Sequence, residues 1–287
     1  MAQDIGTRLE IAIIKQVEKI EYFLSAEKIS PNLAVHEIRK SFKRIRALLK
    51  FYYSAESTIA KETSKQFSEL GKAISTVRDS YIVVQLFERL ANDNKLISER
   101  KLKSAKDKLA EKNRLLVQNS FTESESRYAI LNYLQNFKLK LSKEIVYPGD
   151  EKIVGRLNAS YTKSYNYFNR SEFSDYFEIL HQLRKRLKVL WYQMEFVKFI
   201  NLKYFTPKAE QLHKITEQLG EDHDFFIFLT EINNTQLGLY QTEIEILRNQ
   251  VQHLRDLSHL KLMPRLKQFL SETPEVFGEK MGNLFRE

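Results

Sequence analysis

The stretch that decides the fold runs His36-Glu-Ile-Arg-Lys-Ser-Phe-Lys-Arg-Ile-Arg-Ala-Leu-Leu-Lys50. On a helix of about 3.6 residues per turn, residues three, four or seven positions apart share one side. Cations therefore gather into a stripe with two more on its flank: His36, Arg39, Lys43, Arg46 and Lys50, then Lys40 and Arg44. Apolar residues hold the opposite side: Ile38, Phe42, Ile45 and Leu49. The stretch predicts a helix that is anchored by one face and presents cations on the other.

A second copy of this stretch begins at His181. The same offsets there hold His181, Arg184, Lys188, Trp191 and Glu195, with Lys185 on the flank. Identical residues recur 145 positions apart: His36 and His181, Arg39 and Arg184, Lys40 and Lys185, Lys43 and Lys188, Phe51 and Phe196, Asp79 and Asp224. Chance seldom keeps one register over such a length, so we predict a duplicated helical unit whose copies face each other about a pseudo-twofold axis. The clearest punctuation, Tyr147-Pro148-Gly149-Asp150, divides the chain into residues 1–147 and 148–287.

The composition favours an all-α protein. The 287 residues include only eight glycines and five prolines, fewer turn residues than a sheet protein of this length needs. No cysteine is present, which excludes disulfides, thiolate nucleophiles and cysteine metal sites. Residues 1–6 lack the pattern of a secretory signal, and no apolar run approaches the roughly 18 residues of a membrane span. We therefore expect a cytoplasmic protein that does not enter a membrane.

Helical periodicity predicts the order of the elements. In the first half we expect helices over residues 4–25, 31–53, 96–118 and 123–143, and a long helix or a helix pair over 56–92. Ser30 is expected to cap the helix over 31–53, with Pro31 at its first position. In the second half we expect helices over residues 151–169, 173–200, 207–232, 236–256 and 260–271, followed by a weakly patterned tail, 275–287.

The net charge of +9 is concentrated on the two copies. Residues 36–50 hold six Lys or Arg against one Glu, and residues 181–198 hold five against one, so together they equal the whole net charge. Two such stripes brought together would repel each other unless an anion lay between them. A linear chain of phosphates fits best, because arginines can grip phosphate oxygens in pairs. The candidate ligand contacts are His36, Arg39, Lys40, Lys43, Arg44, Arg46, Lys50, His181, Arg184, Lys185 and Lys188.

The histidines and aspartates of the repeat receive separate interpretations. Each histidine heads its stripe, so we expect it to donate to a phosphate oxygen and to strengthen binding below about pH 6.5. Asp79 and Asp224 would weaken an anion site, so we expect them to orient a basic side chain or to cap a helix. An ordinary surface ion pair is the alternative for the aspartates, and a solvated helix face is the alternative for each stripe.

At these residues the chain resembles the CHAD family, the conserved histidine α-helical domain. The matching patterns are His36-x-x-Arg39-x-x-x-Lys43-Arg44-x-Arg46, His181-x-x-Arg184-x-x-x-Lys188-x-x-Trp191-Tyr192-x-x-Glu195, Arg78-Asp79 and Leu219-Gly220-x-x-x-Asp224. The resemblance covers essentially the whole chain. It implies two related helical bundles that form one domain around a basic central cavity or pore, which binds inorganic polyphosphate. The chain departs from the family pattern at Ser75, where a glycine is expected, and at His223, where a repeat of the first half would have arginine.

We therefore predict a protein that binds inorganic polyphosphate, or another phosphate-rich polyanion, and is not an enzyme. No cofactor, metal or catalytic residue is expected, and an association with polyphosphate granules stays open.

Two other classes stay open beside this prediction. A metal phosphohydrolase of the HD type could use His181, His223, Asp224 and Asp256 as ligands, although the first-half counterpart of His223 is Arg78, which cannot ligate a metal. Nucleic-acid binding is disfavoured but not excluded. Basic stripes suit phosphate backbones and Trp191 could stack on a base, but no helix-turn-helix or aromatic sheet is evident.

Overall fold

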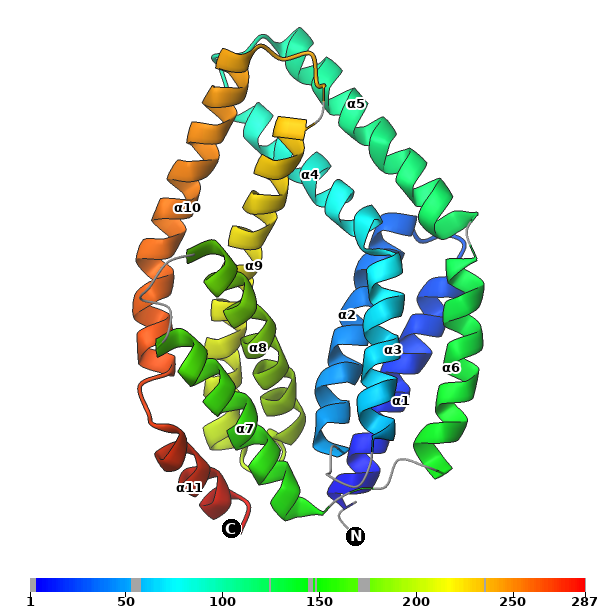
Figure 1. The fold of residues 1–287 in the computed structure, drawn as a ribbon, viewed down its shortest axis with the longest axis vertical. Helices are drawn as coiled ribbons and strands as arrows, with labels where there is room; N and C mark the ends of the chain where they lie inside the picture. The colour runs from blue at the N-terminus through cyan, green and yellow to red at the C-terminus, as the bar shows by residue number, and fades with distance from the viewer. Residues whose placement is uncertain are drawn as a thin grey trace.

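Helices account for the whole regular structure of the described residues. The computed structural model describes residues 4–52, 58–123, 125–143, 147, 149–169, 176–234 and 236–286. Within these ranges no strand occurs, which confirms the all-α prediction. The helices are α1 (Ile5–Ser25), α2 (Pro31–Leu49), α3 (Ile59–Ala73), α4 (Ser75–Asn92), α5 (Glu99–Val117), α6 (Ser126–Lys143), α7 (Asp150–Asn169), α8 (Tyr176–Val197), α9 (Leu202–Asn234), α10 (Gln241–Phe269) and α11 (Pro274–Leu284) (Figure 1).

Local signals start α2 where the sequence predicts it. The Ser30 side chain accepts a hydrogen bond from the Leu33 N–H, and Pro31 takes the first helical position, where a missing N–H has no consequence. A 3₁₀ turn over Lys50–Tyr52 continues the helix. The helix that carries the first cationic stripe is thus defined locally at its start.

Two predictions near the C-terminus were wrong. The two helices expected over 236–256 and 260–271 are a single helix, α10, because neither glycine nor proline interrupts residues 257–260 and Pro264 is accommodated inside the helix. The tail expected to be weakly patterned forms α11. Thr273 caps α11 through the Val276 N–H, and Phe277 and Met281 bury one face of it.

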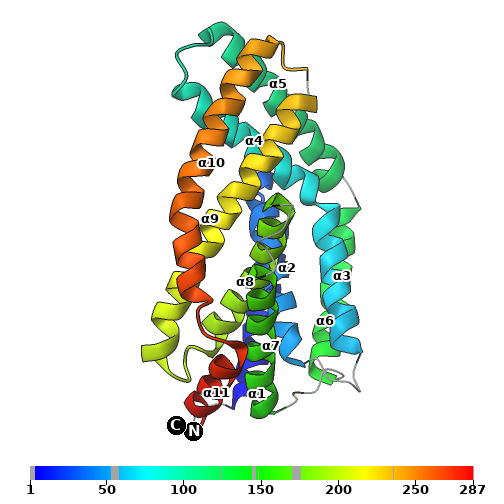
Figure 2. The ribbon, with the colours of Figure 1, turned by 60° about the vertical axis from the view of Figure 1, so that its left-hand side comes forward.

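The apolar side chains form two clusters, and each cluster draws on both sides of residue 147. The larger cluster joins α1, α2, α3 and α6 with α7, α8, α11 and the first part of α9. The smaller one joins α4 and α5 with the second part of α9 and with α10, at the end of the molecule remote from both termini (Figures 1 and 2). Helix α2 packs on α8, and α4 packs on α9. These contacts bring the two copies of the stripe to the middle of the molecule.

The helices keep the register seen in the sequence. Helix α7 begins 145 positions after α1. Helices α3 and α4 are separated at Ile74, whereas α9 runs unbroken through the corresponding position, Leu219. Gly149 adopts a φ of +92°, which suits the punctuation expected there, and Pro148 lies outside the described residues. The division at residue 147 remains a prediction.

None of the described helices combines the length and the apolar character that crossing a membrane requires.

Candidate anion-binding site

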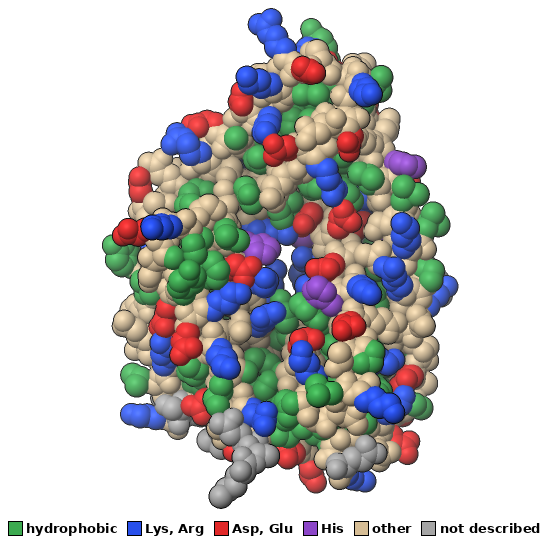
Figure 3. Space-filling model, turned by 180° about the vertical axis from the view of Figure 1, so that it is seen from behind, with side chains coloured by type: hydrophobic (Ala, Val, Ile, Leu, Met, Phe, Trp, Pro, Cys, Tyr) green, Lys and Arg blue, Asp and Glu red, His purple; other side chains and the backbone are tan. Residues whose placement is uncertain are grey.

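Helices α2 and α8 lie against each other at the base of a cavity. Gln193 of α8 donates to the Ala47 carbonyl of α2 at 3.2 Å, and the rings of Phe51 and Phe196 have centroids 5.8 Å apart. Helices α3, α4 and α9 complete the walls around a volume of about 650 Å³. Seen from behind, the molecule is hollowed near its middle, and the side chains around the opening include Lys, Arg and His as well as Asp and Glu (Figure 3).

Eight of the eleven predicted ligand contacts line this cavity. They are Arg39, Lys43, Arg46, Lys50, His181, Arg184, Lys185 and Lys188. The apolar sides of both helices are buried as expected, with Phe42 only 2% exposed and Leu187 fully covered. Both helices are therefore anchored by one face and present the other to the same space.

The other three predicted contacts lie outside the cavity lining. His36 and Lys40 pair with Glu37, at 3.7 and 2.7 Å, and Lys19 reaches the same carboxylate at 2.5 Å. Arg44 lies over the Tyr192 ring, 5.4 Å from its centroid, and lines a separate groove of about 390 Å³ between α1, α2 and α8. These three side chains do not line the cavity, and their assignment as ligand contacts stays a prediction.

Four further basic residues of the lining were missed. They are Lys72, Arg78, Arg186 and His223. Arg78 and His223 immediately precede the two repeated aspartates, 145 positions apart, and that spacing could have identified them. Lys72 and Arg186 have no basic counterpart in the other copy, where Glu217 and Ser41 stand, so the repeat carried no signal for them.

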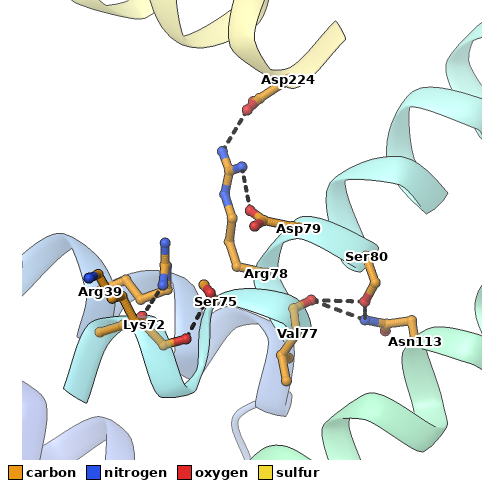
Figure 4. Close-up of polar contacts among 10 residues, drawn as sticks. Arg39, Lys72, Ser75, Val77, Arg78, Asp79, Ser80, Asn113 and Asp224 are labelled. Carbon is orange, nitrogen blue, oxygen red and sulfur yellow. Dashed lines mark hydrogen bonds and ion pairs between the residues drawn. The ribbon is translucent and has the colours of Figure 1, made fainter. Parts of the chain in front are cut away.

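Arg78 joins the two repeated aspartates across the halves (Figure 4). Its guanidinium donates to Asp224 of α9 at 2.8 Å and to Asp79, its neighbour on α4, at 3.2 Å. The Arg78 side chain is only 15% exposed. Arg39 of α2 donates nearby to the Gly71 carbonyl at the end of α3. Both aspartates are thus paired with one arginine, and Asp79 also lines the cavity.

A comparison with models of protein families identifies the family to which this chain belongs. The model of the CHAD domain matches residues 11–232, well over half of the chain. This protein belongs to the CHAD family. A search of curated proteins found no match. The matched range includes every cavity-lining residue and ends within α9, before α10 and α11.

The CHAD cavity is strongly cationic. Ten Lys or Arg residues line it, against a single carboxylate, that of Asp79. Lys43 keeps solvent contact through the cavity, but burial within the surrounding protein and the neighbouring Arg184 lower its pKa well below the ordinary value. Burial first, and then neighbouring cations, lower the pKa of Lys50 and of Lys188 to about 8. Repulsion among these like charges therefore raises the free energy of the unliganded protein, and a bound anion would remove that repulsion.

Three histidines on or beside the stripes, His36, His181 and His223, have lowered pKa values. Burial is the main cause that lowers the pKa of His36 and of His181 below the ordinary value. Burial and the Arg184 charge lower the pKa of His223 to about 3. The protonation expected to begin near pH 6.5 is therefore displaced to lower pH in the unliganded protein.

The ligand set of an HD-type metal site is not assembled. Among the described residues, no group of three or more His, Cys, Asp or Glu side chains is placed to hold a metal ion. Asp224 is engaged by Arg78, and Asp256 accepts a hydrogen bond from Gln252 along α10. The neighbouring Asp222 is buried and paired with Arg255 and His259. No observation in the CHAD cavity favours metal-dependent hydrolysis.

Replacing Arg78 with glutamine is expected to lower the melting temperature of this CHAD protein by roughly 4–8 °C, corresponding to about 2 kcal/mol, because two partly buried carboxylates lose their cation. Differential scanning calorimetry measures the change. The matched control is Arg89→Gln. Arg89 also joins α4 to α9, through Glu221 at 3.1 Å, but both side chains of that pair are nearly half exposed. The control should change stability by less than about 1 kcal/mol. Equal effects of the two variants would contradict this prediction.

The cavity lysines should make stability rise with pH. Lys50 and Lys188 have pKa values of about 8 in the folded protein, against 10.5 ordinarily. Between these two pKa values the unfolded chain binds more protons than the folded protein. The lysines therefore lower the free energy of unfolding fully below about pH 8, and this destabilisation is lost as the pH rises.

The melting temperature in low salt should therefore increase from pH 7 to pH 9.5. The variant Lys50→Met with Lys188→Met should start higher and increase less. The measurement ends at pH 9.5 because tyrosines with raised pKa values, such as Tyr133 and Tyr204 at about 12, make stability fall as the pH rises further. A steeper rise in the variant would be inconsistent with this account.

Proposed function

We propose that this CHAD protein binds inorganic polyphosphate in the cavity between α2 and α8 and that binding does not depend on catalytic turnover. The observation that carries the proposal is the ratio of ten Lys or Arg residues to one carboxylate around a single cavity. The family association with polyphosphate supports the same ligand. A cytoplasmic location, with association to polyphosphate granules, forms part of this proposal.

A linear polyanion matches the cavity better than a compact one. Most of its cations come in two rows, one from α2 and one from α8, with Arg39, Lys43 and Arg46 spaced at successive turns of the first. Rows of this kind present charge at repeated intervals, as the phosphates of a chain do. The arginines can bind phosphate oxygens through two N–H groups, and the lysines add point charge.

We further propose that the two copies form two related bundles about a pseudo-twofold axis through this cavity. An axis of this kind brings each residue near it close to its own counterpart. Phe51 and Phe196, counterparts 145 positions apart, are in ring contact. Asp79 and Asp224 share one arginine. Burial is the main cause that lowers the pKa of Arg39, and its counterpart Arg184 is close enough to add to this effect.

Trp191, the aromatic residue that could stack on a base, does not support nucleic-acid binding. Trp191 is only 9% exposed. Lys188 lies over its ring, 4.2 Å from the centroid, and the His213 ring packs 4.4 Å away. The indole is thus covered by protein side chains and has no face ready to stack on a base.

A competition assay tests the proposal. Trp191 is the single tryptophan of the chain and contacts the cavity lysine Lys188, so its fluorescence is expected to report occupancy of the cavity. Long-chain polyphosphate, pyrophosphate, ATP and single-stranded DNA are titrated at about 0.15 M salt. We expect long-chain polyphosphate to bind most tightly. Single-stranded DNA competing equally well would refute a polyphosphate-specific site.

A further inference from the structure

A cluster of three cations lies where the cavity meets α7. Lys50, in the turn that follows α2, and Arg186 of α8 both line the cavity. Lys163 of α7 is exposed and does not belong to the lining. Helix α7 packs on α8 and also on the turn that holds Lys50. The cluster therefore leads from the interior of the cavity to the surface of the molecule.

Contacts between α7 and α8 bring the three charges together. The Arg186 guanidinium lies over the ring of Tyr167 on α7, 4.6 Å from its centroid. Lys163 precedes Tyr167 by four positions, so both side chains leave α7 on the same side. Burial is the main cause that lowers the pKa of Lys50, and Lys163 and Arg186 are among the cations near enough to add to it. The three charges are therefore neighbours.

Within the described part of the chain, no carboxylate pairs with this cluster. The side chains of Lys50 and Lys163 make neither an ion pair nor a hydrogen bond there. The Nε atom of Arg186 is buried and has no hydrogen-bond partner. A buried donor that stays unsatisfied is unfavourable, and a phosphate oxygen would satisfy it. The cluster thus has the charge and the donor that an anionic ligand requires.

The repeat does not duplicate this cluster. The counterparts of its three cations, 145 positions away in the chain, are Glu18, Ser41 and Glu195. Two carboxylates and a hydroxyl thus occupy the equivalent positions. Glu195 lines the separate groove between α1, α2 and α8, together with Arg8 and Lys15. A polyanion that extends beyond the cavity therefore meets three clustered cations only where α7 borders it.

We propose that Lys50, Lys163 and Arg186 form an extension of the anion site, over which a polyphosphate chain longer than the cavity leaves it along α7. The inference rests on the proposed function and adds selectivity for chain length to it. A short chain is held by the cavity alone. A long chain also contacts Lys163, and each further phosphate contact displaces a counterion and tightens binding.

Lys163→Gln tests the extension, because Lys163 lies outside the lining that holds a short chain. Trp191 fluorescence follows the binding of long-chain polyphosphate and of tripolyphosphate to the full chain. We expect the affinity for the long chain to fall roughly tenfold, the effect of one charged contact. The slope of log affinity against log salt should become shallower by about 0.7. The affinity for tripolyphosphate should stay the same.

The matched control is Lys15→Gln, an exposed lysine of α1 that lines the groove beside Glu195. The control should bind both ligands as the unmodified chain does. A second variant, Lys163→Glu, copies the counterpart residue Glu18 and should weaken long-chain binding further than Lys163→Gln does.

The outcomes separate this inference from the proposed function. Long-chain affinity that is unchanged by Lys163→Gln, or that falls equally in the Lys15→Gln control, overturns the extension and leaves the proposed function standing. An equal loss of affinity for tripolyphosphate and for the long chain also overturns it, because Lys163 would then act on the cavity itself. An unmodified chain that binds neither ligand refutes the proposed function, and the inference fails with it.

Discussion

Polyphosphate affinity should fall by roughly 10²- to 10⁴-fold when Arg39 and Arg184 are both replaced by glutamine. A hydrogen bond to a charged group contributes about 1.5–3 kcal/mol, and each tenfold change in affinity corresponds to about 1.4 kcal/mol, so two such contacts give this range. Both guanidiniums face the cavity, one from each copy of the repeat. Isothermal titration calorimetry with long-chain polyphosphate measures the loss.

The control removes the same charge elsewhere. Arg100 and Arg265 are exposed residues of α5 and α10 that do not line the cavity, so Arg100→Gln with Arg265→Gln should retain most of the affinity. Because Arg39 also donates to the Gly71 carbonyl, the melting temperature of the cavity variant is recorded in parallel. A folded cavity variant that binds as tightly as the control would place the ligand outside the cavity.

Raising the salt concentration from about 50 to about 200 mM should weaken polyphosphate binding by roughly 10²- to 10⁴-fold, if six or more cations displace counterions from the chain. Fluorescence titration of Trp191 at several salt concentrations gives the slope of log affinity against log salt.

The cavity variant and the surface variant should differ in this slope. Loss of Arg39 and Arg184 removes two contacts, which should make the slope shallower by about 1.4. The Arg100 and Arg265 control should keep the original slope. A slope near zero in the unmodified chain would show that phosphate charge does not dominate binding, contrary to the proposal.

The cationic stripes could be predicted from the sequence because they depend on helix geometry alone. Arg39, Lys43 and Arg46 share one side of any helix built on this stretch, and the apolar residues opposite them decide which side is buried. The duplication then indicated that a second helix carries the same face. Helix geometry and the duplication together identified eight residues that line the cavity.

The same geometry could not separate the cavity from its flanks. Lys40 and Arg44 lie within one turn of the stripe, but α1 and α8 pack against that flank. Lys19 of α1 pairs with Glu37, which also pairs with Lys40, and the Tyr192 ring of α8 lies against Arg44. A helix indicates the direction of each side chain relative to its own axis. Which neighbouring helix meets that side chain depends on packing among segments far apart in the chain.

The repeat indicated two halves of one domain but not which helices of one half pack on which helices of the other. Helices α4 and α5 bury Phe87 and Leu109 against Phe228 of α9 and Val251 of α10. The periodicity of each helix predicts that one face is buried but does not identify the partner. The larger cluster likewise joins α2 to α8 across residue 147.

The sequence by itself determined the helices, the two cationic faces and their register of 145 positions, because these follow from the spacing of residues along each helix. Only the tertiary structure decided that both faces border one cavity, that Arg78 joins Asp79 to Asp224, and that His223 lies against His181 among arginines. These contacts join residues of different helices, so they exist only once the helices have packed.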